Sequence, residues 1–249
     1  MSERSEVDLP DKTRIDEETR VFLLDDIPFA ANIEKLRKQC RVREEDTGDF
    51  ERLVGEAVSV ARPKALYRLA YVDALDEDLI AVDGTRLKSR VLKVNLENVH
   101  RVFPFVLTCG REIEEWARSL SDLVHRFWAD ALKIAALRQA GLAMQDHLDR
   151  RFFPGLTSVM SPGSLKDWPI EEQRPLFTIL GEEAGRIGVT ITPQLMMVPA
   201  HSVSGIRFPS ESRFESCQLC PREECPGRRA AYDRTLYERR YALGRGVSA

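Results

Sequence analysis

The spacing of apolar residues in the first half of the chain predicts helices that alternate with strands. Between Gly48 and Leu69, six apolar residues fall on one face at helical spacing. They are Phe50, Leu53, Val54, Ala57, Val58 and Ala61. Pro63 then ends or kinks this helix, because proline lacks the N–H that a helix interior needs. Residues 67–72 alternate between apolar and polar side chains, which predicts a half-buried strand.

Two further patterns indicate a hairpin and a buried strand. Asp83-Gly84 separates the apolar run 79–82 from the run 90–96, and Asp-Gly between two such runs is a hairpin signal. Residues 102–107 form an apolar run that predicts a buried strand. Thr108 is a candidate cap for a short helix that follows it.

A long helix is predicted from about Leu120 to Arg151, because apolar residues recur there at intervals of three and four. This segment is rich in alanine and contains Gly141, so another element can approach it closely. Phe153-Pro154-Gly155 ends the helix.

The stretch from Ser158 to Phe208 carries proline and glycine at its joints. Residues 161–164, Ser-Pro-Gly-Ser, predict a tight turn, because proline fixes φ at the second position and glycine frees it at the third. An amphipathic helix follows, with Gly185 and Gly188 at its end. Strand-like runs complete the stretch, the last of them around a predicted bend at Ser204-Gly205. Together these elements predict a mixed α+β protein.

The composition favours an ordinary globular protein. The chain has 249 residues, of which 43% are hydrophobic and 31% charged. Its net charge of −3 gives no signal for a polyanion, so nucleic acid is not an expected partner. The first residues are polar, and about 18 consecutive apolar residues occur nowhere, so we expect a cytoplasmic protein without a membrane partner. We expect a loose arm over residues 1–18 and a single domain over residues 19–249.

Three of the five cysteines gather in a Cys-rich segment at about residues 215–230, as Cys217-x-x-Cys220-x-x-x-x-Cys225. Structural disulfides are rare in the cytosol, whereas thiolates at this spacing can hold one soft metal ion. Three ligands are one short of a closed zinc site. Candidates for the fourth are His201, Cys40, Cys109, a water or a ligand from a partner. Zinc, an iron–sulfur cluster with an open iron, a redox thiol site and three unligated thiols all stay open.

A set of uncommon residues recurs in the second half of the chain. It comprises Pro162-Gly163, Trp168-Pro169, Gln173, Leu176-Phe177, Ile187-Gly188-Val189, Met196-Met197 with Pro199, and Ser202 to Ile206. These residues resemble the reactivation domain of cobalamin-dependent methionine synthase and, more closely, its short free-standing relatives. The resemblance covers roughly the last hundred residues. It implies an α+β fold in which a twisted antiparallel sheet is flanked by helices.

The resemblance also implies a cofactor site. From the residues alone, the Pro-Gly turn and Ser204-Gly205 are either ordinary turns or places where backbone amides meet a small ligand. In the reactivation domain the Pro-Gly loop lines the S-adenosylmethionine site, so Ser161, Pro162, Gly163 and Ser164 inherit a binding role. An acidic residue on the preceding helix is implied as well, with Asp146 as the nearest match, and so is an aromatic contact near Phe214.

Two positions depart from the pattern of the family. Its loop has an arginine three residues before the proline and a tyrosine directly after the glycine, where this chain has Val159 and Ser164. Both changes remove side chains that are expected to hold the ligand.

By resemblance, the function is that of an accessory protein. It uses S-adenosylmethionine to support the reductive reactivation and methylation of a corrinoid protein or cobalamin-dependent methyltransferase that acts in trans. The cobalamin is then carried by the partner, and a reductant protein is a second candidate partner; no catalytic residue is assigned in this chain. One alternative is a non-catalytic metal- or thiol-containing binding module that has lost S-adenosylmethionine binding. Another is an independent redox enzyme that uses the three cysteines.

Overall fold

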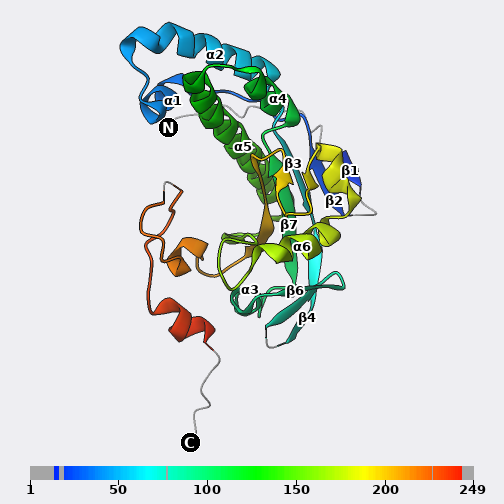
Figure 1. The fold of residues 1–249 in the computed structure, drawn as a ribbon. Coiled ribbons are helices and arrows are strands. Elements are labelled where there is room, and N and C mark those ends of the chain that lie inside the picture. Colours follow the sequence, from blue (N-terminus) through cyan, green and yellow to red (C-terminus); the bar gives the residue numbers. More distant parts are fainter. Residues whose placement is uncertain (1–13, 17–19, 77, 226, 243–249) are drawn as a thin grey trace, which may run out of the picture.

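The computed structural model of the chain describes residues 14–16, 20–76, 78–225 and 227–242 (Figure 1). Within these ranges nine strands form one sheet, and every pairing between neighbouring strands is antiparallel. In spatial order the strands are β1 (Arg14–Asp16), β2 (Val21–Leu24), β3 (Lys64–Arg68), β7 (Arg101–Thr108), β4 (Ala70–Asp76), β5 (Leu79–Val82) and β6 (Thr85–Lys88). Strands β3 and β4 pair with successive parts of the same edge of β7, and β11 (Ser202–Pro209), followed by β8 (Thr157–Met160), lies along its other edge. A separate ribbon pairs β9 (Thr190–Ile191) with β10 (Met197–Val198).

Strand β7 lies at the centre of the sheet, and its apolar residues are buried on both faces. Val106 pairs with Leu66 of β3 along one side and with Ser204 of β11 along the other. A strand covered on both faces reads as a continuous apolar run rather than an alternating one. The buried strand predicted for residues 102–107 is therefore confirmed.

One face of the sheet is covered by α5 (Leu123–Phe152), which runs along it as Figure 1 shows. The small residues of α5 permit this close approach, since Ala140 is fully buried and a β-carbon on Gly141 would lie only 3.4 Å from Leu107 Cδ1. The first half of α5 packs with three further helices at one end of the sheet, around a core that includes Phe50 and Trp128. These helices are α1 (Ile33–Cys40), α2 (Thr47–Val60) and α4 (Arg111–Ser119).

The opposite face carries the largest core cluster. Leu66, Val106 and Ile206 of the sheet pack there with Leu176 and the fully buried Trp168. The covering elements are α3 (Arg90–Asn95), α6 (Gln173–Leu180), the 3₁₀ segments Glu182–Ile187 and Ser216–Leu219, and a π-helical turn at Tyr237–Tyr241. Two further 3₁₀ segments are Glu44–Asp46, between α1 and α2, and Ile170–Glu172, directly before α6. The predicted fold class, an antiparallel sheet flanked by helices, is confirmed.

Three predicted boundaries differ from the structure. The Asp83-Gly84 hairpin forms, but its second strand ends at Lys88, because the Ser89 hydroxyl accepts a hydrogen bond from Leu92 N–H (3.0 Å) and starts α3. The helix after the Pro-Gly turn ends at Leu180, where Gly181 has φ +76°, and a 3₁₀ segment then continues to Gly188. Ser204-Gly205 is no bend, because β11 passes through both residues.

The predicted N-terminal arm lies mostly outside the described residues. Of residues 1–18 the structure describes only 14–16, and these form β1 beside β2 instead of a loose segment. Among the described helices we find none that is long and apolar enough to span a membrane.

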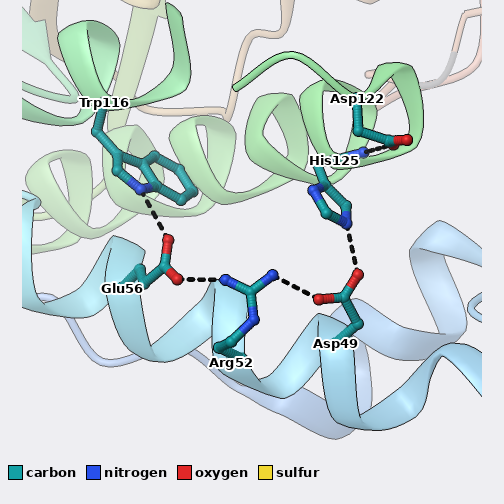
Figure 2. Close-up of polar contacts among 6 residues, drawn as sticks. All are labelled: Asp49, Arg52, Glu56, Trp116, Asp122 and His125. Carbon is teal, nitrogen blue, oxygen red and sulfur yellow. Dashed lines mark hydrogen bonds and ion pairs between the residues drawn. The ribbon is translucent and has the colours of Figure 1, made fainter. Parts of the chain in front are cut away.

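A polar network ties α2 to α4 and α5 (Figure 2). Arg52 bridges Asp49 and Glu56 along α2, and Glu56 in turn accepts a hydrogen bond from Trp116 Nε1 on α4 (3.2 Å). Asp49 also contacts His125 Nε2 on α5 (2.5 Å). The network fixes the rotation of α2 relative to α4 and the start of α5. Because its charged side chains are largely exposed, it orients the helices more than it stabilises the fold.

Asp122 caps the same end of α5. Its Oδ1 atom accepts hydrogen bonds from the N–H groups of His125 (3.0 Å) and Val124 (2.7 Å), and these bonds hold the pKa of the carboxyl group below its ordinary value. A depressed pKa in the folded state contributes stability above the pKa of the unfolded chain, about 3.9, and that contribution is lost as the pH falls through the folded value. We therefore expect Asp122→Ala to lower the urea midpoint at pH 7.

The difference between Asp122→Ala and the wild-type chain should shrink steadily below about pH 4. Asp146→Ala, which removes an exposed aspartate from the interior of the same helix, provides the control, since no side-chain hydrogen bond or ion pair of Asp146 is found among the described residues. A deficit in Asp122→Ala that stays constant down to the lowest pH at which both proteins fold would contradict the capping role.

Candidate functional site

The Pro-Gly turn forms a closed loop between β8 and the helical segment that follows. Gly163 N–H donates to the carbonyl oxygen of Trp168 (2.8 Å), and Ser164 N–H donates to that of Ser161 (3.1 Å). Gly163 has φ +79°, a value that L-residues rarely adopt, so the glycine is required by the backbone. Pro162 is buried, while Gly163 and Ser164 are exposed at the tip. The predicted tight turn is confirmed, and it presents backbone to solvent.

Gly205 brings β11 against the base of this turn. A β-carbon at Gly205 would lie 2.4 Å from the carbonyl oxygen of Met160, 2.8 Å from Ser161 Oγ and 3.1 Å from Phe105 Cζ. Glycine is therefore present because β8 ends directly over it, and not because the chain bends. Of the predicted binding residues, the structure brings Ser161 and Gly205 into direct proximity.

The other predicted binding residues are placed differently. Asp146 is exposed on α5 and forms no side-chain hydrogen bond or ion pair with the turn among the residues that the structure describes. Ser204 is buried within β11. Phe214 is 3% exposed, and its ring packs against Tyr241 with centroids 6.0 Å apart. In this arrangement the C-terminal segment covers Phe214, so its ring is part of the core.

Sequence reasoning missed an arginine beside the turn. Arg207 stands directly opposite Val159 in the β8–β11 pairing, and its Nη1 donates to Thr157 Oγ1 (2.8 Å). Burial lowers the pKa of Arg207, an effect that the carboxylate of Asp149 opposes. A charged residue in a strand ordinarily indicates an outward-facing position, and β8 is some fifty residues away in the chain, so the pattern gave no signal of this placement.

The Cys-rich segment is organised around an arginine side chain. Arg228 Nη1 donates to the carbonyl oxygens of Cys217 (3.2 Å) and Ala230 (3.1 Å), and its Nη2 donates to those of Cys220 (3.2 Å) and Arg222. The guanidinium thus satisfies the inward-facing carbonyls of the loop, as a five-donor cation can.

No group of three or more histidine, cysteine, aspartate or glutamate side chains in the described part of the chain is arranged so that it could hold a metal ion. The arrangement of Cys217, Cys220 and Cys225 therefore gives no support to the predicted zinc or iron–sulfur site.

The candidate fourth ligands Cys40 and Cys109 lie elsewhere, in the helical core around Phe50, whereas Cys220 packs against the cluster on the opposite face of the sheet. Burial raises the pKa of Cys109 to about 12, and the nearby Glu114 carboxylate adds to this, so Cys109 remains a protonated thiol.

His201 belongs to a second polar cluster near the start of β11. Its Nδ1 lies 3.6 Å from Glu114 Oε2, and Lys133 Nζ lies 3.5 Å from the same oxygen and 2.8 Å from Asp130 Oδ1. Glu114 and Lys133 are both buried. The negative charges of Glu114 and Asp130 are offset by the positive charge of Lys133. These contacts link α4 to α5, and His201 links Glu114 to the start of β11.

The fold has a counterpart among solved structures. It is similar to the MetH reactivation domain bound to AdoHcy, with a TM-score of 0.52 over 78% of this chain and 80% of that one. At 14% identity the likeness establishes the fold alone. No protein-family model matches the chain, and no curated protein matches it either.

Proposed function

We propose that this protein binds S-adenosylmethionine at the Pro-Gly turn and supports the reductive reactivation of a corrinoid protein in trans. The observation that carries the proposal is the exposed, glycine-dependent turn at the end of β8, on a fold similar to that of a reactivation domain bound to AdoHcy. The tip of the turn is exposed, and a glycine without a side chain lets a ligand approach the backbone closely.

In this proposal the chain contributes binding and orientation. Ser161 Oγ and the backbone of Gly163 and Ser164 face the ligand, while Gly205 keeps the end of β8 in place through its close approach to Met160 and Ser161. When bound, S-adenosylmethionine supplies a methyl group, and the corrinoid and the electron come from partner proteins. Positioning of this kind is what a protein adds when a cofactor performs the reaction.

A second candidate is a binding module that does not bind S-adenosylmethionine. The observations that favour it are Val159, which replaces the expected arginine, and Phe214, whose ring lies beneath Tyr241. Under this alternative the Arg228-centred loop is a candidate contact surface for a protein partner. The two candidates differ in one measurable property, affinity for the methyl donor.

The proposal is tested with a cobalamin-dependent methionine synthase that lacks its own reactivation domain and carries its corrinoid as Co(II). Under anaerobic conditions with a reductant and S-adenosylmethionine, addition of this protein should restore the absorbance of methylcobalamin faster than reductant and donor alone. The acceleration should disappear when the donor is omitted. Equal rates with and without this protein, measured also with a corrinoid methyltransferase as partner, would contradict the proposal.

A further inference from the structure

Arg207 projects from the sheet next to the strand that leads into the Pro-Gly turn. Residues that face each other in an antiparallel pair point to the same side of the sheet, with β-carbons about 4.5–5.5 Å apart. Val159, opposite Arg207, packs against the core between the sheet and α5. The Arg207 side chain therefore lies on the α5 side, as does Ser161 two residues beyond Val159, since alternate residues share a face.

The guanidinium of Arg207 has unused hydrogen-bonding capacity. Its Nη1 binds Thr157 Oγ1, but its Nε is buried and has no hydrogen-bond partner among the described residues. Arg207 also forms no ion pair within this part of the chain. A partly buried guanidinium whose Nε has no acceptor is costly unless a ligand or water completes its hydrogen bonds.

Two carboxylates act on Arg207 without forming an ion pair with it in the described part of the chain. Asp149, near the end of α5, and Glu215 both act on Arg207 electrostatically, yet neither forms an ion pair with it among the described residues. Arg213 and Arg229 also act on Arg207, and Arg229 is already paired with Glu215 (3.0 Å). None of these groups forms an ion pair with the Arg207 guanidinium in the described part of the chain.

A guanidinium with unused donors matches a carboxylate. We propose that Arg207 binds the carboxylate of the α-amino acid moiety of the ligand, in the same site as the Pro-Gly turn. The inference rests on the proposed function and specifies its ligand as one with a free α-amino acid group. It also explains how Val159 can replace the arginine that the family has at this position. Arg207, which faces Val159 from the neighbouring strand, supplies the guanidinium instead.

The test compares two probes by calorimetry. AdoHcy carries the α-amino acid group, and 5′-methylthioadenosine lacks it while keeping the adenosine and the thioether. Loss of one charged hydrogen-bonding partner corresponds to roughly a 10- to 100-fold loss of affinity. We expect that loss for AdoHcy in Arg207→Gln, with the affinity for 5′-methylthioadenosine unchanged. Arg213→Gln, an exposed arginine on the same edge, is the matched control and should bind both probes normally.

Two further variants test the inference if Arg207→Gln does not fold. Arg207→Lys keeps the charge without the planar fork and should bind AdoHcy with intermediate affinity. The exchange variant, Val159→Arg with Arg207→Val, returns a guanidinium to the facing position and should recover much of the affinity. A purely structural role of Arg207 would not produce this rescue.

The outcomes separate the inference from the proposed function. If the wild-type chain binds AdoHcy and the Arg207 variants bind it equally well, the inference is overturned and the proposed function stands. Equal wild-type affinity for the two probes would overturn the inference in the same way. If the wild-type chain binds neither probe, the proposed function fails and the inference fails with it.

Discussion

Trp168→Ala is expected to destabilise the protein by about 3–5 kcal/mol, the range for removing a large buried aromatic side chain. Trp168 has no exposed surface and packs in the largest core cluster. Its backbone also holds the Pro-Gly turn and the residues after it. The carbonyl oxygen of Trp168 accepts a hydrogen bond from Gly163 N–H (2.8 Å), and its N–H donates to the carbonyl oxygen of Leu165 (3.2 Å). The cavity should therefore loosen the turn as well as the core, and urea denaturation together with AdoHcy titration measures both effects.

Two substitutions provide controls for Trp168→Ala. Trp116→Ala makes the same chemical change at a partly buried position and should cost clearly less. Trp168→Phe keeps most of the volume and removes a buried indole N–H that has no hydrogen-bond partner among the described residues, so it should also cost less. Equal losses in Trp168→Ala and Trp116→Ala would contradict the anchoring role of Trp168.

Gly205→Ala should cost about 1–3 kcal/mol, because overpacked sites force the backbone to move. The added β-carbon would meet the carbonyl oxygen of Met160 at 2.4 Å and Ser161 Oγ at 2.8 Å. Since β8 is an edge strand that pairs only with β11 among the described strands, we expect it to shift away and to take the turn with it. The variant should therefore lose affinity for AdoHcy in addition to stability.

The control for Gly205→Ala is Gly55→Ala in the exposed part of α2, where a β-carbon meets nothing within 4 Å. Alanine is the better helix former by up to about 1 kcal/mol, so this change should stabilise the protein. Chemical denaturation of the two variants should thus give shifts of opposite sign. A neutral Gly205→Ala variant would show that β8 does not depend on the close approach.

Elements that depend on local sequence could be predicted. The spacing of Phe50, Leu53 and Ala57 defines α2, and Asp83-Gly84 defines the β5–β6 hairpin, because each signal lies within the element that it forms. The 90–96 run was wrongly joined to the hairpin, because short apolar runs do not distinguish helix from strand until a cap such as Ser89 is recognised.

The candidate site depends on contacts between distant parts of the chain. The sequence predicted a bend at Gly205. The structure shows that glycine is needed there because β8, which lies far away in sequence, approaches its backbone closely. Phe214 was assigned a ligand contact by resemblance, but Tyr241 near the C-terminus covers it. Arg207 gave no signal, because only the strand pairing brings it opposite Val159. Sequence periodicity describes which face a residue occupies, and not which strand is its neighbour.

The central claim, that the Pro-Gly turn binds the methyl donor, is tested most directly by calorimetric titration with AdoHcy of three proteins. These are the wild-type chain, Gly163→Trp and Gly84→Trp, where the two glycines have similar backbone angles, φ +79° and +74°, in different loops. We predict binding by the wild-type chain and Gly84→Trp, and none by Gly163→Trp. Absence of binding by the wild-type chain, or equal binding by Gly163→Trp, would contradict the account.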